Sequence, residues 1–178
     1  MNEQRTGHRR IDRIRDPAYL GGIDVLALDD LRSRRDECLA EREYLSLLRR
    51  LVQGRAEILR AELDARGSNQ NKGPLIDRLA QILAGDERQS PSRGEAVKVG
   101  LPEEEMLLAR RRIERLVSDA GISDPSALDD ANLASAVDLL ATEEREVSSA
   151  RADVIRVLDT LQDELKRRYR EDPTLVLS

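Results

Sequence analysis

Apolar residues recur at seven-residue intervals in two long stretches of the chain, with polar and charged residues between them. The first stretch runs from about residue 28 to 65, and the second from about residue 130 to 170. Seven-residue spacing is typical of helices that pack along a narrow apolar stripe, as in a coiled coil. The stripe positions are Leu31, Cys38, Leu45, Val52 and Leu59 in the first stretch, and Leu133, Val137, Leu140, Val147, Val154, Leu158, Leu161 and Leu165 in the second.

Two shorter amphipathic helices are predicted in the connection, at about 74–84 and 103–119. Pro102 is a favoured first-turn residue, and the acidic residues that follow it complement the helix dipole. Residues 86–101 are rich in Ser, Pro and Gly and indicate a flexible linker. The sequence therefore predicts an all-α fold. The connection of some sixty residues could join the long helices in either relative direction.

The predicted domain organisation is simple. Residues 1–22, which are locally basic and end in two glycines, are expected to form a flexible N-terminal tail. Residues 23–170 are expected to form a single helical coiled-coil domain that includes the flexible linker. Residues 171–178 are expected to form a C-terminal tail.

Composition supports long helices and excludes several function classes. The chain has 178 residues, 37% of them charged, with no Phe or Trp to fill a compact core. The net charge of −5 gives no support for direct DNA binding or for binding to an anionic membrane. No apolar run approaches the roughly 18 residues of a membrane span, and no signal peptide is evident, so a cytoplasmic protein is expected.

The sequence also argues against catalysis. Cys38 is the only cysteine, so no internal disulfide and no thiolate metal cluster can form. Cys38 is expected to be a small residue of the apolar stripe rather than a redox sensor. No phosphate-cradling loop, clustered metal ligands or nucleophile–base arrangement is present, so the protein is predicted not to be an enzyme.

Each long stretch carries a row of residues that we call a ladder. Residues spaced i, i+4, i+7, i+11 and i+15 fall within about 80° of one another on a helix, so each ladder occupies one face. That face borders the apolar stripe, where polar groups are partly desolvated and need partners. Two copies suggest two helices that contribute to one shared polar site. The first ladder is Arg42, Ser46, Arg49, Gln53 and Glu57, and the second is Glu144, Ser148, Arg151, Ile155 and Asp159.

The ladder residues suit a ligand that carries both phosphates and guanine edges. An Arg guanidinium matches phosphate oxygens or the O6/N7 edge of guanine, and a carboxylate accepts from guanine N1 and N2. The two ladders together hold three Arg and three acids, a mixture that a pure phosphate site would not need. The alternative is a structural or adaptor coiled-coil protein with no small-molecule ligand, whose ladders are ordinary solvated salt-bridge rows.

At these residues the sequence resembles a known family. Residues 47–63 are similar to RsiG, an actinobacterial family of anti-sigma factors that respond to cyclic di-GMP. The family motif is E-x3-S-x2-R-x3-Q-x3-D, with one copy on each helix of a coiled coil. In this chain Arg42 replaces the leading Glu of the first copy, Glu57 replaces its Asp, and Ile155 replaces the Gln of the second copy. The resemblance is expected to extend over residues 18–170.

The resemblance implies both an architecture and a function. It implies an antiparallel helical hairpin that holds a dimer of cyclic di-GMP at the ladder residues. It also implies that the loaded form binds and sequesters a sporulation sigma factor of the flagellar type, called WhiG in that family. We further expect the facing ladder groups to repel one another or to lie unpaired in the empty hairpin, so that the ligand would pair them. Gly54, in the middle of the first long helix, either permits close approach of another helix or a partner or is merely tolerated.

Overall fold

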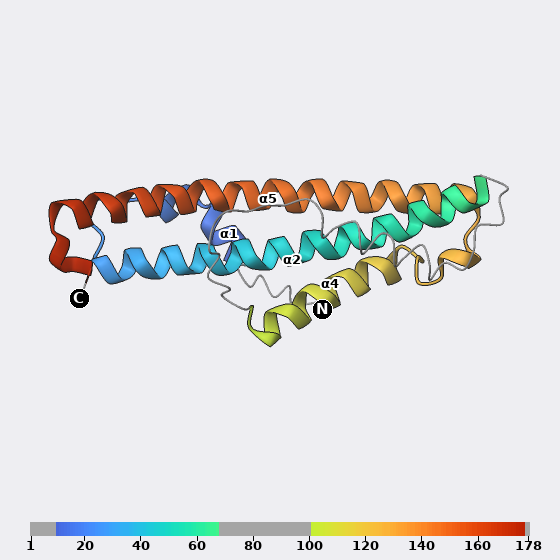
Figure 1. Cartoon of the computed structure of the whole chain (residues 1–178), viewed down its shortest axis with the longest axis horizontal. Helices are drawn as coiled ribbons and strands as arrows, with labels where there is room; N and C mark the ends of the chain where they lie inside the picture. Colours follow the sequence, from blue (N-terminus) through green and yellow to red (C-terminus); the bar gives the residue numbers. More distant parts are fainter. Residues whose placement is uncertain (1–9, 68–100, 177–178) are drawn as a thin grey trace, which may run out of the picture. The chain divides into compact units, whose positions relative to one another are not determined.

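The computed structural model describes residues 10–67 and 101–176, and within these ranges the chain is helical with no strand. Figure 1 shows the elements coloured along the sequence. The predicted short helix at 74–84 and all but the last residue of the predicted linker lie outside the described residues. The helices are α1 (Arg10–Arg15), η1 (Pro17–Leu20), α2 (Leu28–Gly67), α4 (Glu103–Asp119), η3 (Pro125–Ala127), α5 (Asp130–Glu171) and η4 (Pro173–Val176).

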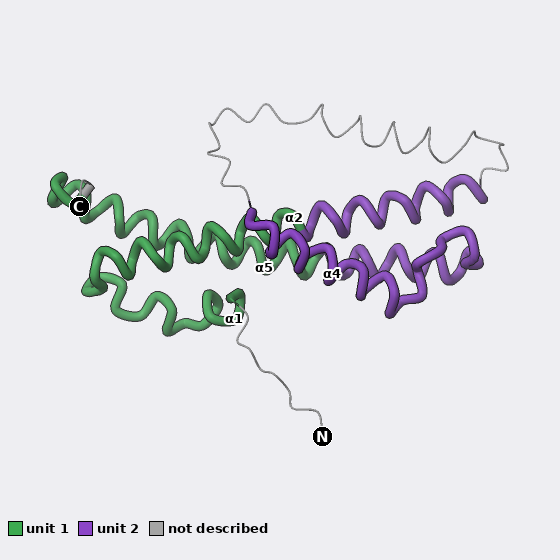
Figure 2. The backbone as a smooth tube through the Cα atoms, turned by 90° about the horizontal axis from the view of Figure 1, so that it is seen from below, with its two compact units in different colours: residues 1–47, 145–178 green, residues 48–144 purple. Residues whose placement is uncertain are grey.

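The chain divides into two compact units (Figure 2). Unit 1 consists of residues 1–47 and 145–178, and unit 2 consists of residues 48–144. Each unit therefore contains one part of α2 and one part of α5.

In unit 1, α2 and α5 run antiparallel. Arg32 Nε donates to the hydroxyl of Tyr169 at 3.1 Å, and Arg151 Nε donates to Ser46 Oγ at 3.0 Å. Residues later in α2 therefore contact residues earlier in α5, as in an antiparallel pair of helices. The buried stripe residues of this unit are Leu31, Cys38, Leu45, Val147, Val154, Leu158, Leu161 and Leu165, each at most 3% exposed. They follow the predicted seven-residue spacing.

In unit 2 the same two helices also run antiparallel. Gln53 Nε2 donates to Glu144 Oε1 at 2.9 Å, and Arg66 Nη1 donates to Asp130 Oδ1 at 3.2 Å. The predicted stripe residues Val52, Leu59, Leu133 and Leu140 are buried, whereas Val137 is only half-buried. The all-α fold with two long antiparallel helices is therefore confirmed.

Residues 10–20 differ from the prediction of a loose N-terminal tail. They form α1 and η1, and the Ile14 side chain of α1 is 1% exposed. Arg10 Nε lies 2.6 Å from Glu41 Oε2 on α2, an acid whose side chain is 6% exposed. Asp16 caps η1 by accepting from Ala18 N at 2.8 Å. Burial of Ile14 and pairing with an acid on α2 are the physical reasons that this segment is ordered in unit 1.

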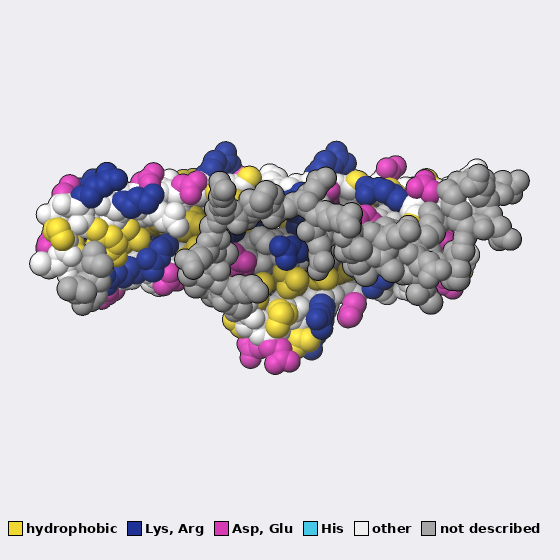
Figure 3. All heavy atoms as spheres, viewed as in Figure 1, with side chains coloured by type: hydrophobic (Ala, Val, Ile, Leu, Met, Phe, Trp, Pro, Cys, Tyr) yellow, Lys and Arg dark blue, Asp and Glu magenta, His cyan; other side chains and the backbone are white. Residues whose placement is uncertain are grey.

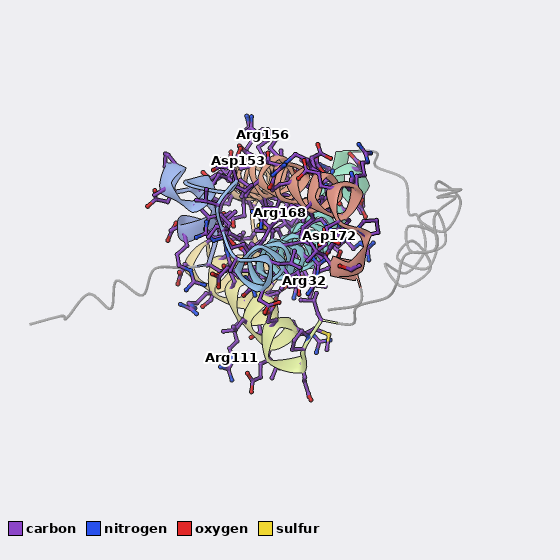
Figure 4. The ribbon with its side chains drawn as sticks, turned by 90° about the vertical axis from the view of Figure 1, so that its left-hand side faces the viewer. Arg32, Arg111, Asp153, Arg156, Arg168 and Asp172 are labelled. Carbon is purple, nitrogen blue, oxygen red and sulfur yellow. The ribbon has the colours of Figure 1, made fainter. Side chains whose placement is uncertain are left out.

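The C-terminal end is also packed where the sequence predicted a tail. Residues Pro173–Val176 form η4, and the Leu175 carbonyl accepts from Arg32 Nη2 at 2.7 Å. Arg168 of α5 donates to the Ile23 carbonyl at 2.8 Å. Figure 4 labels both of these arginines. Arginines of α2 and α5 thus hold η4 and the turn that precedes α2.

In unit 2, α4 packs through one face and exposes another. Its buried residues are Ala109, Ile113 and Val117, and Arg112 Nη2 lies 2.7 Å from Glu143 Oε1 on α5. Leu107 and Leu108 are 41% and 55% exposed, so hydrophobic side chains appear on the surface of α4 in Figure 3. None of the helices within the described ranges is both long enough and apolar enough to cross a membrane.

Candidate functional site

In unit 2, three ladder residues contact one another across the two long helices. Arg49 Nε and Gln53 Nε2 both donate to Glu144 Oε1, at 3.1 and 2.9 Å. The side chains of Arg49 and Glu144 are 41% and 30% exposed. Residues 49 and 53 are one helical turn apart on α2, so they reach the same carboxylate. The result is a half-buried cluster of one cation, one amide and one anion.

In unit 1, the cross-helix contact is between an arginine and a hydroxyl. Arg151 Nε donates to Ser46 Oγ at 3.0 Å, and Ser46 Oγ donates to the Arg42 carbonyl at 2.7 Å. The Arg42 guanidinium instead pairs with the adjacent Glu43, at 2.7 Å from Nη2 to Oε1. Glu43 was not predicted as a site residue, because a neighbour at i+1 does not lie on the ladder face.

The remaining ladder residues contribute less to the interface between α2 and α5. Glu57 and Asp159, the last residues of the two ladders, are exposed, and Ser148 and Ile155 are half-buried. Within the described part of the chain, no hydrogen bond joins the side chain of Glu57, Ser148 or Asp159 to another residue. The structure therefore brings five of the predicted residues together in two sets, one of Arg49, Gln53 and Glu144 and one of Ser46 and Arg151. The last residue of each ladder is exposed to solvent.

The expectation that the ladder groups would be unpaired in the empty protein is wrong for the five residues that meet across the two helices. Donors and acceptors meet because the antiparallel register puts Glu144 opposite both Arg49 and Gln53, and Ser46 opposite Arg151. Any ligand that binds these groups must therefore exchange its own contacts for theirs. Partly exposed ion pairs contribute only about 0–1 kcal/mol, so that exchange has a small cost.

The comparison with protein families supports the resemblance over part of the chain. A family model described as RsiG-like matches residues 17–83, which include η1, the whole of α2 and the first ladder. The second ladder, on α5, lies outside that match, although the resemblance was expected to reach residue 170. No curated protein matches the chain. The family is a regulatory one. The resemblance is thus confirmed for residues 17–83, which are similar to the RsiG-like family, and this similarity suggests the role of an anti-sigma factor.

Proposed function

We propose that this protein is an anti-sigma factor that binds cyclic di-GMP through its ladder residues, and that the loaded form sequesters a flagellar-type sporulation sigma factor similar to WhiG. The ligand is taken up as a dimer, as the family resemblance implies. The observation that carries the proposal is the pairing of Arg49 and Gln53 with Glu144 across the helix interface, at positions that the RsiG-type motif marks. Because sigma factors act in the cytoplasm, the proposal places this protein there as a regulator.

The side chains present have the chemistry that cyclic di-GMP requires. Glu144 presents carboxylate oxygens that can accept from guanine N1 and N2. Arg49 and Arg151 present planar donors that can bind guanine O6 and N7 or a phosphodiester oxygen. Ser46 adds a hydroxyl beside Arg151. Each set is half-buried, so its hydrogen bonds are less weakened by water than those of exposed side chains.

Ligand binding can raise sigma affinity because it replaces the cross-helix contacts of the empty state with stronger ones. Each bidentate contact to a guanine contributes roughly 1–3 kcal/mol of discrimination, more than the roughly 0–1 kcal/mol of a partly exposed ion pair that it displaces. If the sigma factor binds one arrangement of the helices, loading increases the fraction of molecules in that arrangement. Apparent sigma affinity then rises in proportion to that fraction.

Nucleotide binding is tested by calorimetry on the full chain. Arg49→Ala and Arg151→Ala are expected to abolish measurable cyclic di-GMP binding while helicity persists. Arg55→Ala on α2 and Arg156→Ala on α5 are the matched controls, since Arg55 is exposed and off the ladder face, and the Arg156 side chain is 77% exposed and points outward in Figure 4. Unchanged nucleotide affinity in both ladder variants would refute the assignment.

The sigma partner is tested separately, by measuring capture of a purified WhiG-type sigma factor with and without cyclic di-GMP. Capture is expected to require the nucleotide and to be lost in Arg49→Ala. The second candidate function is a structural or adaptor coiled coil, favoured by the fact that Arg49 and Glu144 already satisfy each other without a ligand. That function predicts a melting temperature that does not change with cyclic di-GMP concentration, whereas a ligand of the native state raises it.

A further inference from the structure

Every arginine of α1 pairs with an acid of the two long helices in unit 1. Two of these acids lie one helical turn apart on α2, and the third lies on α5. The pairs are Arg10 with Glu41, Arg13 with Glu37 and Arg15 with Asp153. Asp153 also pairs with Arg156 of its own helix, and Figure 4 labels both residues. Unit 1 thus presents an acidic surface to a short basic helix, and we call Glu37, Glu41 and Asp153 the α1-binding acids.

The same surface buries one apolar side chain of α1. Ile14 is 1% exposed, although it stands between two arginines in the sequence. Burial of an apolar side chain contributes more to binding than partly exposed ion pairs do, whereas charge complementarity selects the partner. The chemistry that this surface accepts is therefore defined by its present occupant. It is a basic helix with one branched apolar side chain.

Helix α1 can be displaced from this surface. Its six residues are too few to form a stable helix in isolation. The side chains of Arg13 and Arg15 are 57% and 42% exposed, so their ion pairs contribute little to holding the helix. The Arg10 pair is less exposed, because the Glu41 side chain is only 6% exposed. Helix α1 is thus held by one apolar side chain and one protected ion pair.

The next segment, η1, has attachments of its own and can remain bound when α1 leaves. The Tyr19 hydroxyl lies 3.1 Å from the Arg34 carbonyl and 2.9 Å from Glu37 Oε2. The Arg34 guanidinium also lies over the Tyr19 ring, 5.4 Å from its centroid. Because η1 stays attached, released α1 remains tethered beside its surface. It therefore competes with any other helix that binds there.

We propose that α1 is an autoinhibitory segment that covers a surface of unit 1 to which a basic helix of a partner protein binds. The partner helix has the chemistry of α1, with cationic side chains that reach the α1-binding acids and one branched apolar side chain in the place of Ile14. This inference goes beyond the proposed function and does not depend on cyclic di-GMP. Since the partner and α1 compete, the apparent affinity of the partner rises with the fraction of molecules in which α1 is released.

The test is fluorescence anisotropy of the full chain with two labelled peptides. The first peptide is residues 7–16 of this chain, and the second places the α1 arginines and isoleucine at the same spacing on a background of alanines. Ile14→Ala in the full chain is expected to bind both peptides about 30-fold more tightly than the unaltered protein, because loss of the buried side chain favours release of α1 by that factor. Added salt should weaken this binding.

The controls separate the acidic surface from general loosening of the protein. Val25→Ala, at an 81% exposed residue, should leave peptide affinity unchanged. Asp153→Asn added to Ile14→Ala should weaken binding of both peptides, because a peptide arginine then lacks its acid on α5. A peptide in which glutamates replace the arginines should not bind.

A second variant keeps the test valid if Ile14→Ala does not fold. Arg13→Gln combined with Arg15→Gln loosens α1 while Ile14 is kept, and it should raise peptide affinity by a smaller factor. The inference is overturned if neither variant binds the peptides more tightly than the unaltered protein. It is also overturned if only the peptide of residues 7–16 binds, because the surface would then recognise α1 itself rather than basic helices of its kind.

Discussion

The N-terminal helix α1 is expected to be held on unit 1 mainly by one side chain, that of Ile14. It is the buried residue of this six-residue helix, at 1% exposure. Ile14→Ala removes three buried carbons, a change that costs about 2–5 kcal/mol in a well-packed core. An isolated helix of this length is not stable in water, so α1 depends on its packing. The variant should therefore release α1 before the remainder of unit 1 unfolds.

The expected magnitude follows from that cost. A loss of at least about 2 kcal/mol corresponds to roughly 30-fold faster opening of the segment, since 1.4 kcal/mol is a factor of ten. The measurement is amide hydrogen exchange with mass spectrometry on the full chain, which follows peptides that cover residues 10–20 and 28–47. Exchange should accelerate about 30-fold or more in residues 10–20 and change little in α2.

The matched control is Val25→Ala, because Val25 is 81% exposed and its truncation should leave exchange unaltered. The reasoning is refuted if Ile14→Ala leaves exchange at residues 10–20 unchanged while exchange in residues 28–47 accelerates. That result would mean that Ile14 belongs to the main core of unit 1 and that α1 does not open as a separate segment.

Three further predictions concern a thiol, a carboxyl and a glycine. Burial raises the pKa of the Cys38 thiol to about 11, so iodoacetamide at about pH 8 should modify Cys38 only after urea unfolds the chain, and rapid modification of the folded protein would contradict this. Hydrogen bonds from neighbouring arginines lower the pKa of Glu164 from 4.5 to about 2, so its contribution to stability is complete above pH 4.5 and is lost as pH falls towards 2. Glu164→Gln should therefore show a smaller drop in melting temperature than the unaltered protein between about pH 5 and pH 2, and equal drops would refute the assignment. Gly54→Ala should raise the free energy of unfolding by about 0.5–1 kcal/mol in urea titrations, since no described atom lies within 4 Å of an added Cβ. A stabilised variant that captures sigma factor less well would show that a partner approaches Gly54, whereas a destabilised variant would contradict the prediction.

The long helices could be predicted from the sequence because their apolar spacing persists over many turns. The predicted ranges 28–65 and 130–170 agree with α2 (Leu28–Gly67) and α5 (Asp130–Glu171) to within two residues at each end. Helix α4, predicted at 103–119, begins and ends as expected. Periodicity over that many residues averages out the individual exceptions, such as the half-buried Val137.

The N-terminal helix could not be predicted in the same way. Its only apolar residues are Ile11 and Ile14, within a run of arginines, and six residues carry too short a pattern to distinguish a packed helix from a basic tail. What orders it is tertiary, namely the burial of Ile14 and the pairing of Arg10 with Glu41. The aspartate before Pro17 was a local signal for η1, because it caps the following turn.

For the candidate site, the sequence could predict which helix face carries each ladder, but not which residues of the other helix its side chains contact. Spacing fixes which side chains share a helix face, whereas the cross-helix register depends on how the apolar stripes interlock. The register determines that Glu144 meets Arg49 and Gln53. Arg42 pairs instead with Glu43 on its own helix.

The pairing in the empty state changes how a ligand could act on this protein. If the ladder groups were unpaired without ligand, the nucleotide would have to overcome repulsion between the helices. Instead, Glu144 and Ser46 already link α2 to α5, each within its own unit, so the antiparallel pairs exist before any ligand binds. Under the proposed function, a nucleotide then replaces weak, half-exposed contacts with stronger ones. The difference between these two sets of contacts, rather than the formation of the helices, is the free energy available to control binding of a sigma factor.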